Sequence, residues 1–344
     1  MAERATLTDI AQRAHVSEAT VSRVLNNKPG VSERTRTAVL TTVDAMGYER
    51  PTRLRPKETS VVGLITPELT NPIFPAFAQT IETLLDRSGY TPMLCTQTTG
   101  GVHEDAYVRK LQDNGVAGIV YVSGQHADTT TDPDRYRRLQ RDGLPIVLVN
   151  GFVEGLDVPF ISHDDVASVQ LAVRHLAELG HTRIGLAVGP MRYLPVVRKT
   201  MAFRQAMRDI DGHADGDDLV AHALFTIDGG GQAAERLLAR GATALVCGSD
   251  LMALGAIRAA RAAGLDVPRD VSVVGFDDSL LMEFTDPPLT TIRQDVVGMG
   301  EAAVRALLEE IEGSRTRRGE HLFRPELVVR SSTGPAPTTA SSRA

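Results

Sequence analysis

The sequence predicts an α/β protein of two parts, a small three-helix module followed by a larger body of two doubly wound parallel sheets. Residues 7–27 have the pattern of two short helices joined by a tight turn. From Val61 onward, short apolar runs alternate with amphipathic helices, which is typical of parallel strands covered by helices on both faces. Between the two parts, residues 48–60 are polar, basic and interrupted by Pro51 and Pro56, as expected of a linker.

Length and composition narrow the class of protein. A chain of 344 residues with 42% hydrophobic content is too long for one compact unit and can bury large cores. It has no apolar run near 18 residues, and its first ten residues lack the apolar core of a secretory signal. Cys95 and Cys247 lie in apolar stretches and are expected to be buried free thiols. We therefore expect a cytoplasmic protein without a metal or cofactor.

Charge is distributed unevenly along the chain. Residues 1–58 carry ten Lys/Arg and seven Asp/Glu, a net charge of +3, and the remainder carries 27 and 36, a net charge of −9. A cationic N-terminus on an anionic body favours an oriented approach to phosphates. Binding to a nucleic acid should then weaken steeply with salt.

The first two helices have opposite faces of different character. Thr8 is the expected N-cap of a helix over 9–14, and Ser17 caps a second helix that ends near Leu25. One face of the second helix is apolar and contains Val21, Val24 and Leu25. The other face carries small, polar and basic side chains: Glu18, Ala19, Ser22 and Arg23. A DNA major groove can admit such a face. The alternative is a helical hairpin whose polar face is only solvated.

A third helix is expected to begin after its N-cap Ser32 and to end at Gly47, a left-handed C-cap. Its apolar positions should close a small three-helix core: Val39, Leu40 and Val43. Arg34 and Arg36 are free to reach phosphates, or are simply solvated surface charges.

The body divides into two series of strands and helices. The first has strands at 61–66, 91–96, 118–123 and 145–150. The second begins near Phe160 and has strands at 183–189, 220–224, 244–249 and 271–276. The strand within 289–294 and the helix 296–311 are expected to return to the first subdomain, before a last strand at 327–330. These assignments give a headpiece (1–48), a hinge linker (49–60), a core (61–333) and a disordered tail (334–344). Within the core, the first subdomain is about 61–160 plus 290–330, and the second about 161–289.

Residues 6–51 contain the motifs D-I-A, V-S-x-x-T-V-S-R-V-L-N, V-S-x-x-T-R and G-Y-x-x-P. With these motifs the segment resembles the headpiece of the LacI/GalR repressor family. The segments GHTRIG, CGSDLMALGAIRAARAAGLDVPRDVSVVGFDD and PPLTTIRQ resemble the effector-binding core of the same family, which is similar to periplasmic sugar-binding proteins. The resemblance covers about residues 6–333. It implies a helix-turn-helix headpiece and a periplasmic-binding-protein-like α/β core of two doubly wound parallel-sheet subdomains.

Motif positions matched to this family imply a set of DNA contacts, with Arg23 as the leading base-reading residue. The set is Thr8, Ser17, Glu18, Ala19, Thr20, Ser22, Arg23, Asn26, Arg34, Arg53, Leu54 and Arg55. In the family, a leucine of the linker wedges into the minor groove. Leu54 is the candidate here, but this linker is about three residues short, lacks A-x-x-L, and has Pro56, which would stop a helix. Whether a hinge helix forms stays open.

Effector contacts are expected at the carboxyl ends of strands, where doubly wound sheets bind ligands. Asp164, Ser249 and Asp277 follow predicted strands, and the resemblance implies that Phe74 lines the pocket. The expected set is Ile73, Phe74, Asp164, Arg198, Lys199, Ser249, Asp277 and Gln294. The family places an arginine where Arg198 or Lys199 stands, and the choice stays open. N-capping is the alternative for Asp164, Asp250 and Asp277, as core packing is for Phe74.

The favoured hypothesis is a repressor of a carbohydrate-utilisation operon that binds a pseudo-palindromic operator as a homodimer, or as a tetramer. A small effector would change operator affinity, as inducer or corepressor. GYERPTRLRP and TNPIFPAFAQ resemble repressors of maltose or other α-glucoside operons, which implies an oligosaccharide. One alternative is a sugar-acting enzyme that uses an acidic cluster, Asp164, Asp165, Asp277 and Asp278. The other is a secreted solute-binding protein. Catalytic residues and membrane association are not expected.

Overall fold

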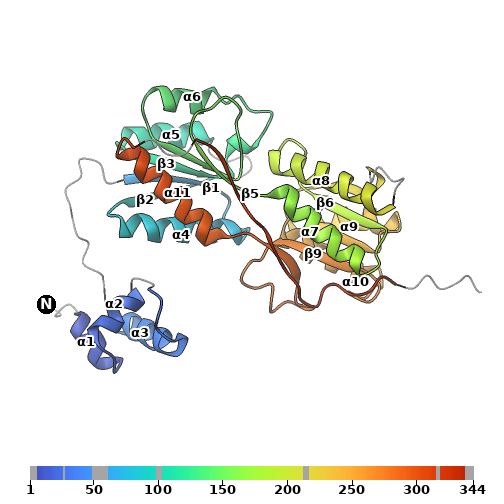
Figure 1. The fold of residues 1–344 in the computed structure, drawn as a ribbon, viewed down its shortest axis with the longest axis horizontal. Coiled ribbons are helices and arrows are strands. Elements are labelled where there is room, and N and C mark those ends of the chain that lie inside the picture. The colour runs from blue at the N-terminus through green and yellow to red at the C-terminus, as the bar shows by residue number, and fades with distance from the viewer. Residues whose placement is uncertain are drawn as a thin grey trace, which may run out of the picture. The chain divides into compact units, whose positions relative to one another are not determined.

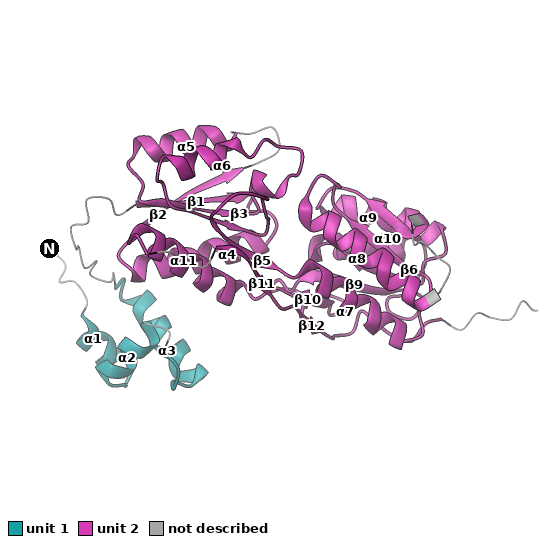
Figure 2. Cartoon of the chain, turned by 45° about the horizontal axis from the view of Figure 1, so that its top comes forward, with its two compact units in different colours: residues 1–55 teal, residues 56–344 magenta. Residues whose placement is uncertain are grey.

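The structure is a computed structural model that describes residues 6–25, 28–48, 61–97, 103–211, 217–314 and 318–337. The chain divides into two compact units, residues 1–55 and 56–344 (Figure 2). In the described part of the chain, no helix is both long enough and apolar enough to cross a membrane. The predicted linker 49–60 lies outside the described residues, as do Asn26, Arg53, Leu54 and Arg55.

Unit 1 is a three-helix module formed by α1 (Leu7–Arg13), α2 (Glu18–Leu25) and α3 (Glu33–Ala45). The N-cap of α1 is Thr6, which exchanges hydrogen bonds with Asp9 in a capping box. The prediction that Thr8 caps this helix is therefore wrong, because the helix begins before it. The Thr8 hydroxyl instead donates to Glu18 Oε1 at 2.7 Å and so connects α1 with α2.

The core of this module is small and made of aliphatic side chains: Ile10, Ala11, Val21, Val24 and Val39. Ser17 and Ser32 cap α2 and α3 through bonds from the N–H groups of Thr20 and Thr35, both at 3.2 Å, as predicted. Gly47 has the predicted left-handed backbone, with φ of 58°. Leu40 is 47% exposed, so the prediction that it closes the core is wrong. That place is taken by residues that pack partly buried against the core: Leu7, Ala14, Val16, Leu25, Val31, Val43, Met46 and Tyr48.

Among the described residues, the first sheet of unit 2 has six strands in the order β11-β5-β4-β3-β1-β2. Figure 1 shows this sheet with α5 and α6 on one side and α4 and α11 on the other. Their bounds are β1 Val61–Pro67, β2 Thr91–Gln97, β3 Gly118–Val122, β4 Ile146–Val149, β5 Pro159–His163 and β11 Gly319–Phe323. Side chains of α4 (Ile73–Arg87) and α11 (Val296–Ile311) share one apolar cluster with this sheet. Those of α5 (Glu104–Asp113) and α6 (Asp134–Arg141) share another, so helices cover both faces.

The second sheet also has six strands, in the order β12-β10-β9-β8-β6-β7. Their bounds are β6 Ile184–Val188, β7 Val220–His222, β8 Ala244–Cys247, β9 Ser272–Asp277, β10 Thr290–Arg293 and β12 Glu326–Val328. One face packs against α7 (Asp165–Glu178) and α8 (Leu194–Asp211), the other against α9 (Ile227–Ala239) and α10 (Asp250–Ala262). Every pairing in the two sheets is parallel except that of β10 with β12.

Three strands belong to the opposite sheet from the one predicted. The strand near Phe160, β5, pairs with β4 in the first sheet, whereas β10 pairs with β9 and with β12 in the second. The chain thus passes between the sheets at three places in the described residues: from β5 to α7, from β10 to α11, and from β11 to β12. The strand β11 was not predicted, because its sequence GEHLF lacks the apolar run of an interior strand.

The prediction of a disordered tail is wrong for residues 334–337. Gly334 donates its N–H to Ser272 Oγ at 3.0 Å, and Ala336 donates to the Leu179 carbonyl at 2.8 Å. These bonds hold the segment on the second subdomain. Residues 338–344 lie outside the described part.

Gly229, Gly230 and Gly231 lie in the first turns of α9, where α9 packs against α10. A Cβ on Gly230 would overlap the Met252 backbone, and one on Gly255 would overlap the Ile227 carbonyl. These glycines therefore permit the close approach of the two helices. Cys95 and Cys247 are buried free thiols, as predicted.

Candidate functional site

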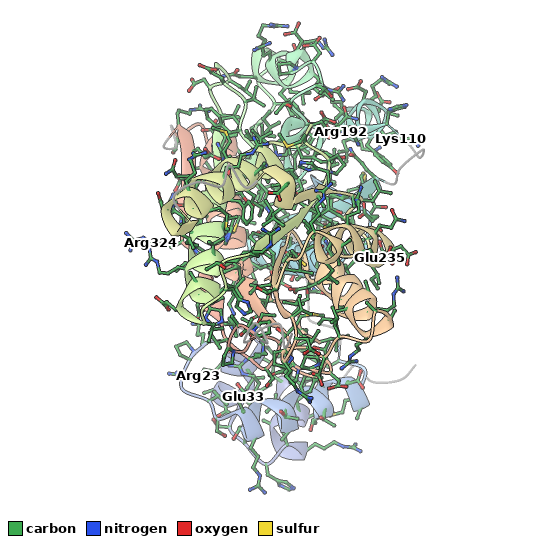
Figure 3. All side chains as sticks on the ribbon, turned by 90° about the vertical axis from the view of Figure 1, so that its right-hand side faces the viewer. Arg23, Glu33, Lys110, Arg192, Glu235 and Arg324 are labelled. Carbon is green, nitrogen blue, oxygen red and sulfur yellow. The ribbon has the colours of Figure 1, made fainter. Side chains whose placement is uncertain are left out.

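The surface of α2 opposite its core is polar. Val21 and Val24 are buried, while Glu18, Ala19 and Arg23 are exposed. Arg23 Nη1 donates to the Pro29 carbonyl at 3.3 Å, at the surface of unit 1 (Figure 3). This bond holds the end of the guanidinium beside the loop that follows α2.

Arg34 is exposed in the first turn of α3. Arg36 Nη2 donates to the Lys28 carbonyl at 3.4 Å, so this second guanidinium braces the same loop. The described members of the predicted DNA-contact set thus lie on one small module: on α1, α2 and the start of α3.

In unit 2, left-handed backbone outside glycine concentrates at the carboxyl ends of strands. Ser123 follows β3, Asn150 follows β4, Asp277 is the last residue of β9, and Asp278 follows it, with φ of 47°, 59°, 116° and 57°. Such conformations are strained, and they accumulate where a site fixes a side chain. The three strand ends are therefore candidates for a site.

Seven residues near these ends form what we call the strand-end cluster: Asn150, His163, Asp165, Lys199, Phe276, Asp277 and Gln294. Asn150 Nδ2 donates to Gln294 Oε1 at 3.3 Å, and Gln294 Nε2 donates to Asp277 Oδ1 at 2.6 Å. Because β4 belongs to the first sheet and β9 to the second, this chain of bonds joins the two subdomains.

Lys199 is the buried cation of the cluster. Its ammonium pairs with the Asp165 carboxylate and lies 3.8 Å from the centroid of the Phe276 ring, a cation–π contact. The edge of the His163 ring meets the same aromatic ring, with centroids 5.1 Å apart.

Burial controls the titration of the cluster. It raises the pKa of Asp277 well above its ordinary value, and the nearby Asp250 carboxylate adds to the rise. Burial also raises the pKa of Asp165, although the Lys199 ammonium opposes the rise. Burial, and secondarily Lys199, lower the pKa of His163 to about 3. His163 is therefore neutral at physiological pH.

This neutral histidine makes stability depend on pH. The unfolded residue takes up a proton near pH 6.5, but the folded residue does so only near pH 3. The contribution of the neutral ring to the free energy of unfolding is complete above pH 6.5. It is lost as the pH falls toward 3, at roughly 1.4 kcal/mol per pH unit. Between pH 7 and 5 we expect His163 to account for about 2 kcal/mol of lost stability. Urea unfolding of the His163→Gln variant should show a flatter pH dependence than the wild type; parallel curves would contradict the assignment.

Several predicted site residues have structural partners. Asp164 caps α7 by accepting the Ala167 N–H at 2.9 Å. Ser249 caps α10 by accepting the Met252 N–H at 3.2 Å, so Asp250, the predicted alternative cap, is not the cap. Arg198 makes a two-bond ion pair with Glu320 of β11, at 2.7 and 2.8 Å.

The remaining predicted residues, Ile73 and Phe74, belong to a hydrophobic core. Ile73 is buried in the core between α4, α11 and the first sheet, and Phe74 packs partly buried against the same core. Core packing therefore accounts for both side chains in this structure. Of the predicted effector set, the structure brings Lys199, Asp277 and Gln294 together in the strand-end cluster.

Sequence reasoning did not select Asn150, His163 or Phe276. The signal for Asn150 was its place directly after an apolar run and before Gly151, in V-N-G, where a left-handed residue is common. His163 and Phe276 looked like strand residues. Their role arises only from the meeting of β5 and β9, which belong to different sheets.

A hollow elsewhere in unit 2 does not coincide with the cluster. It is lined by Pro159 and Gly319, at the amino ends of β5 and β11, and by α11. Ligands of open parallel sheets bind at the carboxyl ends of the strands. The strand-end cluster is therefore the better candidate: its carboxylate and amide oxygens can accept hydroxyl hydrogens, and its amide and ammonium groups can donate to hydroxyl oxygens.

Comparison with known proteins identifies the family. Residues 6–51 match the model for "Bacterial regulatory proteins, lacI family", and residues 173–333 match the "Periplasmic binding protein-like domain". The HTH-type transcriptional regulator MalR of Streptomyces coelicolor is 60% identical over 96% of this chain and 97% of its own. The chain belongs to the LacI family. The repressor CytR of Escherichia coli is 32% identical over 97% of both chains.

Solved LacI-family structures share the fold. The transcriptional regulator CelR in complex with cellobiose has a TM-score of 0.70 and 31% identity, over 96% of this chain and all of that one. The lac repressor dimer bound to operator has a TM-score of 0.69 and 26% identity, with the same coverage. This protein is a LacI-family transcriptional regulator, and the family contains regulators rather than enzymes. The enzyme and solute-binding alternatives are therefore wrong.

The acidic residues of the enzyme hypothesis have partners of their own. Asp164 is a helix cap and Asp165 pairs with Lys199. Asp278 accepts from Arg293 and from Arg330, both at 2.7 Å. These three carboxylates thus have structural partners, and the fourth, Asp277, belongs to the strand-end cluster.

Proposed function

We propose that this regulator is a cytoplasmic homodimeric repressor of a carbohydrate-utilisation operon, whose affinity for a pseudo-palindromic operator is changed by an oligosaccharide. The observation that carries the DNA half is the α2 surface, which exposes Glu18, Ala19 and Arg23 opposite a buried Val21 and Val24. A face of that size and polarity fits a major groove.

The proposed contacts divide into two kinds. Arg23 reads a base, with Glu18 and Ala19 setting the preference around it. The others position the headpiece on the duplex backbone: Thr8, Ser17, Thr20, Ser22, Asn26, Arg34, Arg53 and Arg55, with Leu54 as the minor-groove wedge. Residues 49–60 are the proposed hinge between headpiece and core.

For the effector we propose a sugar at the strand-end cluster, where Asp277 and Asn150 accept hydroxyl hydrogens and Lys199 and Gln294 donate. Ile73, Phe74, Asp164, Arg198 and Ser249 complete the proposed site. Support for an oligosaccharide comes from the cellobiose complex of the similar regulator CelR and from the MalR relative.

For the dimer, an apolar surface supports contact with a second copy. Leu280, Leu281 and Phe284 are 81%, 62% and 74% exposed in the loop after β9. Exposed groups of large apolar side chains mark interaction sites. Two headpieces are also needed to read an operator with two half-sites, and the similar lac repressor was solved as an operator-bound dimer.

The effector assignment is tested by calorimetric titration of the purified chain with maltose, maltotriose and cellobiose. At least one should bind, and Asp277→Asn should weaken that binding about tenfold or more, since it replaces one carboxyl oxygen of a buried site with an amide nitrogen that can only donate there. The matched control is Asp228→Asn, which changes an exposed carboxylate of α9. Equal affinities of the wild type and Asp277→Asn would contradict the assignment.

A further inference from the structure

A second connection joins the subdomains, away from the strand-end cluster. Residues 128 and 193 form an antiparallel bridge, and Thr129 donates both its N–H and its hydroxyl to the Arg192 carbonyl, each at 2.8 Å. The side chains add an ion pair, with Arg192 Nε 3.1 Å from Asp128 Oδ2. Asp128 follows β3 of the first sheet, and Arg192 follows β6 of the second.

This connection lies away from the three crossover segments through which the chain passes between the subdomains. The chain passes between the sheets through β5, β10, β11 and β12, which lie at or next to one edge of each sheet. In the strand order, β3 is two strands from β5, and β6 is three strands from β10. At roughly 4.8 Å per strand, the bridge lies about 10–14 Å from the crossover side of the sheets. By the crevice we mean the space between the two subdomains at the carboxyl ends of their strands, where the strand-end cluster lies. Contacts that far from the crossover segments must break when the subdomains swing apart and this crevice opens.

Hydrogen bonds to Glu104 fix the loop that carries Asp128. The Glu104 side chain is fully buried. Glu104 Oε2 accepts the Gln125 N–H at 3.0 Å and the Gln97 side-chain amide at 3.1 Å. Its other oxygen accepts the Tyr136 hydroxyl at 2.6 Å. A buried carboxylate is tolerated only when such bonds satisfy it, so Glu104 determines where the loop lies.

The same loop is tied at two further points. His126 bonds the Val149 carbonyl at 3.0 Å, at the end of β4. The Thr131 hydroxyl donates to the Gln125 carbonyl at 2.8 Å, which closes the loop on itself. A loop held this way has little freedom, so Asp128 and Thr129 are presented to Arg192 without an ordering cost at each closure.

We propose that residues 124–131 form a latch that holds the effector crevice closed through Asp128 and Thr129 on Arg192, and that Glu104 is the positioning residue of this latch. The latch sets how often the empty crevice opens, and so adjusts effector affinity and the operator response together. Arg192 is the exposed and replaceable half of the ion pair (Figure 3). The inference rests on the proposed function only in treating the crevice as the effector site.

The latch is tested by measuring the distance between the subdomains without any sugar. Spin labels are attached through Arg141→Cys on α6 and Met201→Cys on α8, both exposed positions, while the native Cys95 and Cys247 are buried and do not react. Pulsed electron resonance should show mainly one short distance in the otherwise wild-type chain. Arg192→Glu should raise the long-distance population about two- to fivefold, as expected for loss of a partly exposed pair.

Three further variants separate positioning from general damage. Glu104→Gln should shift the population in the same direction, and Asp128→Arg combined with Arg192→Glu should restore much of the short distance. Arg269→Glu, which breaks an exposed pair with Asp266 within the second subdomain, should change nothing. The latch is refuted if Arg192→Glu gives the same distances as Arg269→Glu. Because no sugar is present, failure to find an effector would leave this result intact.

Discussion

Replacing Asp165 with asparagine is expected to destabilise the core by about 3–5 kcal/mol, the usual cost of leaving a buried charge without its partner. Asp165 and Lys199 are each 6% exposed, and the two charged groups are in direct contact. The asparagine cannot neutralise the ammonium, which also lies against the Phe276 ring and cannot move to solvent without exposing it. Urea unfolding at pH 7 measures the loss.

The reason for this effect is the isolated charge rather than the lost pair. Burial raises the pKa of Asp165, and the Lys199 ammonium opposes this rise because it favours the charged carboxylate. The double variant Asp165→Asn with Lys199→Met should therefore recover most of the stability, because neither charge remains. Asp266→Asn, at an exposed pair with Arg269, is the control and should cost less than about 0.5 kcal/mol. A loss of under about 1 kcal/mol for Asp165→Asn would show that the pair is not effectively buried.

Arg23→Ala is expected to weaken operator binding by about 1–3 kcal/mol and to relax the preference at the base pair that Arg23 contacts. The guanidinium is exposed on α2 and is held only by the Pro29 carbonyl, at 3.3 Å, among the hydrogen bonds of the described residues. Release from that carbonyl would allow a two-bond contact with a guanine. Fluorescence anisotropy against operators changed one base pair at a time measures both effects.

Arg34→Ala is the matched control for base reading. Arg34 is exposed at the start of α3, where a phosphate contact should weaken binding to all duplexes alike and lower the salt dependence by about one ion. Because Arg23 also braces the loop after α2, thermal unfolding of Arg23→Ala must match the wild type. If Arg23→Ala weakens all operator variants equally, then Arg23 positions the headpiece and another residue reads the base.

The elements of the core could be predicted from the sequence because each buried strand is a continuous apolar run and each helix has one apolar face. Sheet membership could not. The apolar runs that form β5 and β10 could pair with buried strands of either sheet. Hydrophobic periodicity therefore predicts a strand but not the strand with which it pairs. The edge strand β11 has too few apolar residues to be recognised, and Leu40 shows that an apolar residue in a short helix is not always core.

The site was predictable where it follows the strand-end rule. Asp277 is the last residue of β9 and Gln294 directly follows β10, and a hydrogen bond of 2.6 Å joins their side chains. The same rule selected Asp164 and Ser249, whose side chains cap helices instead, because a strand end in this fold is also a helix start. His163 and Phe276 could not be predicted, because their ring contact joins the ends of two strands, β5 and β9, that belong to different sheets.

The most direct test of the account is selection of duplexes from a randomised library by the purified chain at low ionic strength, without sugar and with maltose, maltotriose or cellobiose. We predict enrichment of two inverted half-sites, and an affinity for the enriched duplex that one of the tested sugars changes about 5–150-fold. Binding of the enriched pool no tighter than that of bulk DNA, under every condition, would contradict the claim that the first three helices read an operator under control of the core.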